Sequence, residues 1–263
     1  MIFGIDEVGR GPLAGPLCVG IVSLDPEKEI VGLNDSKKLT EKRREELSFE
    51  IKEKAIYWNT LFIDRQIIDN LNIKNATIKG IEEIIANIPT EYKPSEILID
   101  GDDKIQTSFI TKSIIKGDET EPSIMAASII AKVERDEWMD GIDMKFPEYG
   151  FKRHKGYGTK DHLRAIKIYG PCEEHRKSFK PVKNFKFSAL EAFDKYEISI
   201  IAKELLQNKT DQEIKKELTK LTEKAEFLKE EKKQAEIERI KMLQDTLRTE
   251  WIFIKNASRR RSF

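Results

Sequence analysis

Every glycine and proline of this 263-residue chain lies in its first 181 residues. Gly170 is the last glycine and Pro181 is the last proline, so no helix breaker occurs from Val182 to Phe263. Strand-like and helix-like periodicities alternate in the first part, whereas Lys and Glu dominate the second. The chain is therefore predicted to combine an α/β region with a long extension that is entirely helical.

The first part contains five strand-like apolar runs, with helical periodicity between and after them. Strands are expected at 2–6, 18–24, 55–63, 96–100 and 111–117. Helices are expected at roughly 40–53, 65–87, 121–140 and 159–169. Three strands in a meander followed by helix–strand alternation predict an α/β domain with a mixed sheet.

The extension carries a heptad-like apolar pattern. Thr210 followed by Glu213 is a capping-box signature, so a new helix is predicted to begin near residue 211. The apolar positions have the 4-3-4-3 spacing of a coiled-coil seam and are Ile214, Leu218, Leu221, Ala225 and Leu228. The seam fails at Lys232 and resumes out of phase at Ile240, Leu243, Leu247 and Trp251.

Because an amphipathic helix needs a partner for its apolar face, three arrangements are open for the extension. A hairpin or fold-back is expected first, self-association second, and docking on a protein partner is the third. The terminal Arg259–Arg261 run is either a frayed, solvated end or a nucleic-acid-binding arm.

Charge and composition exclude several classes of protein. Lys+Arg and Asp+Glu both number 47, so the net charge indicates no partner. Two cysteines are too few for a disulfide scaffold. No apolar run approaches the ~18 residues of a membrane span, and Met1 opens directly into a strand pattern without a signal-peptide flank. A soluble, cytoplasmic protein without a membrane partner is expected.

Acidic residues follow three of the predicted strands. Asp6 and Glu7 end the first strand, just before a glycine-rich turn, and neighbouring residues can share a site only where a strand ends or bulges. Asp100 closes the strand EILID, and Asp118 comes just past the strand that ends in IIKG. Acids at the ends of three strands are expected to converge on one edge of the sheet.

Four neighbouring carboxylates repel one another unless cations neutralise them. Oxygen ligands select hard ions such as Mg²⁺ or Mn²⁺, and two such ions flank a phosphodiester in many nucleases. Taken singly, each acid is more often a strand-end cap than a ligand. The prediction of a metal site therefore depends on the four acids together.

Seven sequence blocks, in this order, resemble bacterial ribonuclease HII over roughly residues 1–185. The blocks are GIDEVGRGPLAGP (4–16), LNDSKKLT (33–40), LIDG (98–101), KGD (116–118), SIMAASIIAKVERD (123–136), HKGYGT (154–159) and HRKSFKPVK (175–183). The resemblance implies a ribonuclease H-like fold, with a mixed five-stranded sheet and helices around it. It implies endonucleolytic hydrolysis of RNA in RNA–DNA hybrids and at single ribonucleotides in duplex DNA, leaving 5′-phosphate and 3′-hydroxyl ends.

The same resemblance assigns roles to individual residues. The catalytic, metal-binding carboxylates would be Asp6, Glu7, Asp100 and Asp118, with Mn²⁺ or Mg²⁺ in a two-metal site. The substrate contacts would be Gly9, Arg10, Gly11 and Tyr157, and the basic cluster at the start of a predicted helix adds Lys37. The glycine-rich turn would contact the 2′-hydroxyl, the lysine a phosphate, and the tyrosine the sugar after the ribonucleotide.

Other interpretations of these residues are open when each is taken alone. A loop tyrosine beside basic residues often only packs on the surface, and the turn lacks the GK[ST] of a nucleotide-binding P-loop. His154, His162 and His175 match no zinc spacing, and we expect no direct catalytic role for them.

The predicted domains are a catalytic domain at 1–186, a closing helix at 187–208 and a charged helical extension at 209–263. The compact family pattern has no counterpart for the extension. Two alternatives to a nuclease are a non-catalytic hybrid-binding protein and a scaffold whose coiled coil recruits a replication or repair partner. Retention of all four acids argues against the first, and the second is compatible with an enzyme.

Overall fold

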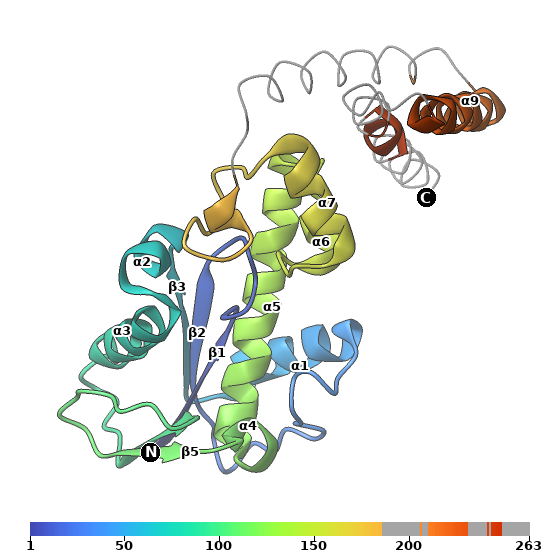
Figure 1. Ribbon diagram of the computed structural model, residues 1–263. Coiled ribbons are helices and arrows are strands. Elements are labelled where there is room, and N and C mark those ends of the chain that lie inside the picture. Colours follow the sequence, from blue (N-terminus) through green and yellow to red (C-terminus); the bar gives the residue numbers. More distant parts are fainter. Residues whose placement is uncertain (186–205, 207–209, 231–240, 242, 249–263) are drawn as a thin grey trace. The chain divides into compact units, whose positions relative to one another are not determined.

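The computed structural model describes residues 1–185, 206, 210–230, 241 and 243–248 (Figure 1). The chain divides into two compact units. The sheet unit comprises Met1–Ile142, Lys155–Tyr157 and Glu174–Lys183. The helical unit comprises Asp143–His154, Gly158–Glu173 and the described residues of Asn184–Phe263. The predicted domain limits stay predictions, and nearly all of 187–208 lies outside the described residues.

The sheet unit is built on a mixed sheet with the strand order β3-β2-β1-β4-β5. Its strands are β1 (Ile2–Val8), β2 (Leu17–Ser23), β3 (Tyr57–Ile63), β4 (Glu96–Asp100) and β5 (Thr111–Ile114). The β1–β2 and β2–β3 pairs are antiparallel, whereas β1–β4 and β4–β5 are parallel. The predicted five-stranded mixed sheet is confirmed.

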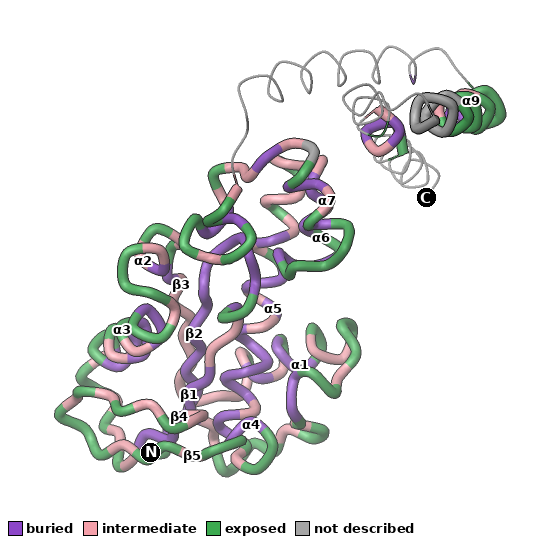
Figure 2. Tube along the Cα trace, viewed as in Figure 1, coloured by how far each residue is buried: buried purple, intermediate pink, exposed green. Residues whose placement is uncertain are grey.

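Helices cover both faces of this sheet (Figure 1). They are α1 (Glu41–Lys54), α2 (Arg65–Leu71), α3 (Ile73–Ala86), the short α4 (Gly117–Thr120) and α5 (Pro122–Lys145). On one face Phe3 and Ile5 of β1 join the isoleucines of α2 and α3 in a buried core. On the other face Val22 of β2 packs with residues of α1 and α5. Strands β1, β2 and β4 between the two layers are largely buried, whereas the outer strands β3 and β5 are more exposed (Figure 2).

Two predicted elements differ from the structure. The helix expected at 65–87 is broken at Asn72, which has a φ of 65° and whose side chain accepts a hydrogen bond from the Asn75 amide at 3.1 Å. Asparagine tolerates this left-handed φ and caps a helix well, so α3 begins anew. The strand expected to reach residue 117 ends at Ile114, and Lys116, with a φ of 59°, turns the chain into α4.

Glycines let α5 approach the sheet at the end where the acids lie. A Cβ on Gly4 of β1 would lie 2.2 Å from the Ser123 carbonyl carbon. A Cβ on Gly20 of β2 would lie 2.5 Å from the carbonyl oxygen of Ala127. A larger residue at position 4 or position 20 would therefore push α5 away from the sheet.

The helical unit contains α6 (Phe151–His154), α7 (Lys160–Tyr169) and α9 (Asp211–Glu230). The capping box at the start of α9 is confirmed, because the Thr210 amide donates to Glu213 Oε2 at 2.7 Å and the Glu213 amide to Thr210 Oγ1 at 3.4 Å. No helix in the described residues is long and apolar enough to cross a membrane.

Part of the extension folds back on itself, as predicted. One buried apolar cluster consists of Leu206, Ile214, Leu218 and Leu247. Gln244 also donates a hydrogen bond to the Thr222 hydroxyl at 2.9 Å. The other seam residues predicted from the sequence (Ala225, Leu228, Lys232, Ile240, Trp251) and the Arg259–Arg261 run lie outside the residues whose side chains are described.

Candidate active site

The two adjacent acids of β1 lie in regular strand. Asp6 pairs with Gly20 of β2 and Glu7 with Val19, and the strand continues to Val8. The predicted strand end or bulge at the acidic pair is therefore wrong, and the two side chains leave opposite faces of the sheet. Asp6 is 5% exposed and lies on the α5 face.

Asp100 and Asp118 reach Asp6 from the parallel side of the sheet. Ile99 of β4 pairs with Ile5 of β1, so the next residue, Asp100, lies beside Asp6. Asp118 stands in the first turn of α4, and its amide donates to Asp100 Oδ1 at 3.3 Å. Asp118 thus follows a turn and a helix start rather than the strand itself, because β5 ends early.

Burial and mutual repulsion act on these carboxyls. Burial, and then the charges of Glu7 and Asp100, raise the pKa of Asp6 well above its usual range. Burial and the neighbouring Asp118 raise the pKa of Asp100. Burial raises the pKa of Glu7, although Arg10 opposes this effect. The acids that were expected to converge are therefore close enough for the charge of one to raise the pKa of another.

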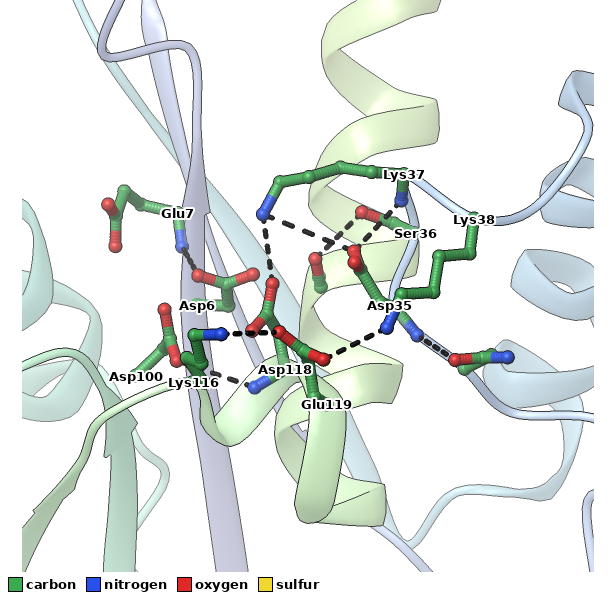
Figure 3. Close-up of polar contacts among 12 residues, drawn as sticks. Asp6, Glu7, Asp35, Ser36, Lys37, Lys38, Asp100, Lys116, Asp118 and Glu119 are labelled. Carbon is green, nitrogen blue, oxygen red and sulfur yellow. Dashed lines mark hydrogen bonds and ion pairs between the residues drawn. The ribbon is translucent and has the colours of Figure 1, made fainter.

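A lysine from the loop before α1 reaches this group. Lys37 Nζ lies 2.9 Å from Asp118 Oδ2 and 4.0 Å from Asp35 Oδ1 (Figure 3). Its hydrogen bond to Asp118 raises the pKa of Lys37. Because the Lys37 side chain is 77% exposed, its ammonium is accessible to a phosphate from solvent. Next to it, Lys38 pairs with Glu119 at 2.9 Å.

A pair of serines ties this lysine loop to the acids. The Ser36 and Ser128 hydroxyls are 2.9 Å apart, and both residues are buried. Ser128 on α5 also hydrogen-bonds Asp6, which lowers the pKa of that carboxyl against the effect of burial. The sequence analysis missed these serines, and the available signal was a hydroxyl in the otherwise aliphatic stretch AASIIA.

The donor set suits a hard divalent cation, but it is not a finished coordination sphere. All four side chains offer only carboxylate oxygens, the ligands that Mg²⁺ and Mn²⁺ take. Asp6, Asp100 and Asp118 lie together, whereas the Glu7 carboxylate points away from them (Figure 3). Among the described residues no group of three or more His, Cys, Asp or Glu side chains is arranged so that it could hold a metal ion as it stands.

The glycine-rich turn and the tyrosine loop lie side by side. A Cβ on Gly11 would lie 3.5 Å from Tyr157 Cε1, and Tyr157 is 43% exposed. Gly9 has a φ of 104°, which side-chain-bearing residues rarely adopt. Arg10 Nη1 lies 3.2 Å from Glu7 Oε1, so the turn also contacts the acidic end of β1. The structure therefore places Gly9, Arg10, Gly11 and Tyr157 near one another, whereas Lys37 lies beside Asp118.

The histidines are held elsewhere. His154 and His162 belong to the helical unit, where their rings stack with centroids 4.4 Å apart. His175 is fully buried in the sheet unit and forms an isolated β-bridge with Ala14. Their expected lack of a catalytic role stays a prediction.

Known proteins similar to this chain agree with the geometry. A family model described as Ribonuclease HII matches residues 3–182. The ribonuclease HII of Bacillus cytotoxicus is 52% identical over 183 residues, which cover 70% of each chain. That of Idiomarina loihiensis is 48% identical over 183 residues, covering 70% of this chain and 97% of its own. The structure of the PCNA:RNase HII complex from Archaeoglobus fulgidus matches with a TM-score of 0.60 and 30% identity, covering 73% of this chain and 100% of that one.

These matches span the sheet, the acidic residues and both loops beside them. The chain belongs to the ribonuclease HII family and is a ribonuclease H enzyme.

Proposed function

We propose that this ribonuclease H is a metal-dependent endonuclease that cuts the RNA strand of RNA–DNA hybrids and also DNA at single embedded ribonucleotides. The products would carry 5′-phosphate and 3′-hydroxyl ends. The observation that carries the proposal is the group of three acids, the buried Asp6 and Asp118 and the half-buried Asp100, whose repulsion would be relieved by binding of a cation. The cytoplasm is the proposed compartment.

Asp6, Asp100 and Asp118 would hold Mn²⁺ or Mg²⁺, and Glu7 would complete a two-ion site. Such ions lower the pKa of bound water and stabilise the leaving oxygen of a phosphodiester. The chain's own residues position the substrate: Lys37, beside Asp118, is within reach of a phosphate on the acidic edge. A like-charged phosphate approaches this edge only when cations neutralise it.

Recognition of the ribonucleotide is assigned to the turn and to Tyr157. The 2′-hydroxyl, which both donates and accepts hydrogen bonds, separates RNA from DNA. Backbone groups of Gly9, Arg10 and Gly11 can approach it because no bulky side chain intervenes at the glycines. The half-exposed Tyr157 ring lies next to Gly11 and is placed to pack on the adjoining deoxyribose.

The helical extension is proposed to contact a protein partner or a second copy of the chain. The similar Archaeoglobus fulgidus protein was solved in a complex with PCNA, so that enzyme does bind a protein. In this chain, the buried cluster around Leu218 uses part of the apolar seam internally.

The test of the function is cleavage of duplex DNA that contains one ribonucleotide, with Mn²⁺ and Mg²⁺ in turn, and with all-DNA duplex as the control. We expect metal-dependent cutting at the ribonucleotide only. Saturating metal should also raise the melting temperature, because a ligand at 100 times its Kd stabilises the folded state by about 2.7 kcal/mol. Cutting in the presence of a chelator, or no cutting with either metal, would contradict the proposal.

A further inference from the structure

Two fully buried arginines lie behind the glycine-rich turn. Arg135 comes from α5 and Arg176 from the segment after α7, and both have 0% exposure. Their guanidinium groups donate to backbone carbonyls, and neither makes an ion pair with an acid of the described chain. Burying two charges without acids is costly, so apolar packing alone does not explain their presence.

Arg176 binds the inner side of the turn. Its Nη2 donates to the Gly9 carbonyl at 2.6 Å and its Nη1 to the Arg10 carbonyl at 3.0 Å. Two more hydrogen bonds go to the carbonyls of Gly15 and Pro16, at 3.0 and 3.1 Å. One planar guanidinium thus holds both ends of the loop.

The hydrogen bonds from Arg176 to the turn determine the direction of two backbone amides. In a trans peptide the carbonyl and the following N–H point in opposite directions. With the Gly9 and Arg10 carbonyls turned toward Arg176, the amides of Arg10 and Gly11 point to the opposite side. Neither amide donates to an acceptor within the residues that the structure describes. They are the groups that the turn can offer to a ligand.

Arg135 joins the same loop to the tyrosine loop. Its Nε donates to the Pro16 carbonyl at 2.9 Å and its Nη2 to the Ala14 carbonyl at 3.3 Å. Its Nη1 donates to the Lys155 carbonyl at 3.0 Å, two residues before Tyr157. This one side chain therefore links the two loops.

Contacts around Arg135 fit this bridging position. The Leu13 amide donates to the Gly156 carbonyl at 2.8 Å, which is a second link between the loops. A Cβ on Gly9 would lie 2.3 Å from Arg135 Nε, so this arginine is one reason why position 9 is glycine. Burial lowers the pKa of Arg135, and the nearby Tyr157 opposes that effect.

We propose that Arg176 and Arg135 are positioning residues for ribonucleotide recognition: Arg176 presents the amides of the turn to the 2′-hydroxyl, and Arg135 sets the distance from the turn to Tyr157. The proposal rests on the function proposed above. A turn that reads the ribose and a tyrosine that reads the next sugar must keep a fixed spacing for a ribonucleotide–deoxyribonucleotide junction. A continuous RNA strand presents no such junction within the site.

The test compares Arg176→Lys and Arg135→Lys on two substrates, DNA with one ribonucleotide and a continuous RNA–DNA hybrid. Lysine keeps the charge but cannot reproduce the planar fork. Small misplacements of substrate-positioning groups cost up to about 100-fold in rate. Arg176→Lys should lower kcat/KM at least roughly tenfold on both substrates, since both have the 2′-hydroxyl. Arg135→Lys should lower it at least roughly tenfold on the junction substrate but less than about threefold on the hybrid.

Ile84→Ala, in the core on the α2–α3 face, is the matched control for lost stability. All proteins are assayed at the same interval below their melting temperatures, and the control should keep the wild-type ratio between the substrates. If Arg135→Lys also keeps that ratio, or Arg176→Lys keeps its rate on both substrates, the positioning role is refuted. Failure of the proposed function looks different, because the wild-type protein would then cut neither substrate.

If Arg135→Lys does not fold, Gly156→Ala takes its place. A Cβ there would lie 2.5 Å from the Ala14 carbonyl oxygen and would force the two loops apart. A folded Gly156→Ala protein should lose the preference for the junction substrate. If it retains the wild-type preference, the spacing of the loops does not matter and the proposal for Arg135 is overturned.

If Arg176→Lys does not fold, Gly15→Ala takes its place, because Gly15 has a φ of 82° and its carbonyl binds Arg176. A folded Gly15→Ala protein should lose rate equally on both substrates. An unchanged rate on both would overturn the role of Arg176.

Discussion

The sheet unit contains two groups of like charges, one acidic and one basic, and they differ in how their charges are compensated. In the acidic group, Asp6, Asp100 and Asp118, burial and neighbouring negative charge raise two of the pKa values, although amides, Ser128 and Lys37 donate hydrogen bonds to its carboxylates. The arginine group, Arg135 and Arg176, is held in place by carbonyls on every side. The negative charges of the acidic group are thus only partly compensated within the chain, whereas both guanidinium groups of the arginine group are satisfied by carbonyl oxygens.

The difference separates chemistry from positioning. A site that binds cations gains from unrelieved negative charge, because each bound cation then releases repulsion. Residues that orient a substrate benefit from complete hydrogen bonding, because a side chain whose donors are all paired is held in one conformation. Substitutions in the two groups should therefore change different measurements.

The largest expected effect is loss of cleavage in Asp100→Asn. Removing one carboxylate takes a ligand from the cation site, and we expect kcat to fall at least about 10³-fold, or roughly 4 kcal/mol in the barrier. Affinity for the hybrid should be unchanged or higher, because a negative charge facing phosphate is removed. Single-turnover cleavage and binding assays measure the two effects.

Asp25→Asn, which removes an acid from a loop salt bridge with Lys28, is the control for a lost carboxylate and should cut normally. Near-normal turnover of Asp100→Asn at saturating Mn²⁺ would refute the assignment. Asp6→Asn should behave as Asp100→Asn does in cleavage.

The comparison is most direct in stability, where the two groups should respond with opposite signs. Without metal, Asp6→Asn should raise the melting temperature by a few degrees, where about 1 kcal/mol corresponds to about 2–4 °C. Arg176→Leu should lower the free energy of unfolding by about 3–5 kcal/mol, because it leaves buried carbonyls unpaired. Calorimetry of the metal-free wild type, Asp6→Asn and Arg176→Leu proteins measures these changes. Melting temperatures that shift in the same direction in both variants would contradict the proposed difference between the two groups.

The pH dependence of wild-type stability checks the same point. Asp6 and Asp100 have folded pKa values raised above the unfolded ones, so the folded state holds their protons more tightly. Their stabilising contribution is full below the unfolded pKa, near 4, and is lost as the pH rises through the folded pKa. In Asp6→Asn the loss between acidic and neutral pH should be smaller than in wild type.

A smaller effect is expected at the edge of the arginine group, in Tyr157→Ala. Stacking of an aromatic ring on a base is worth about 1–3 kcal/mol, and packing on a sugar should be similar or less. Cleavage at a single ribonucleotide should therefore fall about 5- to 150-fold, while metal-induced stabilisation stays as in wild type. Wild-type cleavage of that substrate by Tyr157→Ala would remove Tyr157 from junction recognition.

The apolar runs of the sequence were enough to predict the sheet, because a strand pattern is a short-range signal. Of the acids predicted at strand ends only Asp100 closes a strand, since Asp6 and Glu7 lie within β1 and Asp118 lies in α4. The sequence did not predict where β1 ends, since the glycine at position 9 follows a strand that runs two residues longer than expected. Nor did it predict the break at Asn72, because the apolar period continues through that residue.

The role of the arginine group could not be predicted from the sequence for a different reason. Arg135 and Arg176 stand in the quoted blocks VERD and HRKS, where an arginine reads as a solvated charge. Their partners are carbonyl oxygens of a loop more than a hundred residues away, and every residue type supplies such an oxygen. Only the tertiary structure can identify contacts of this kind. Ser128 was missed because its partners are equally remote in sequence.

The smallest expected effect is that of removing the extension after residue 208. Every proposed catalytic, substrate-binding and positioning residue lies in the sheet unit. In the helical unit the truncation removes the ion pair between Arg164 and Asp245, at 2.7 Å, and a partly exposed pair of this kind is worth about 1 kcal/mol or less. We therefore expect kcat to stay within about twofold of the full chain, with Arg164→Ala as the control for the lost ion pair.

Binding can still change in the truncated protein while the chemistry does not. Loss of the Arg259–Arg261 run would weaken affinity for nucleic acid and flatten its dependence on salt, since fewer counterions are then released. Titrations at two salt concentrations separate this effect from catalysis. A truncated protein that folds but cannot cut would show that the extension is part of the active enzyme, because the acidic and arginine groups alone would then be insufficient for cleavage.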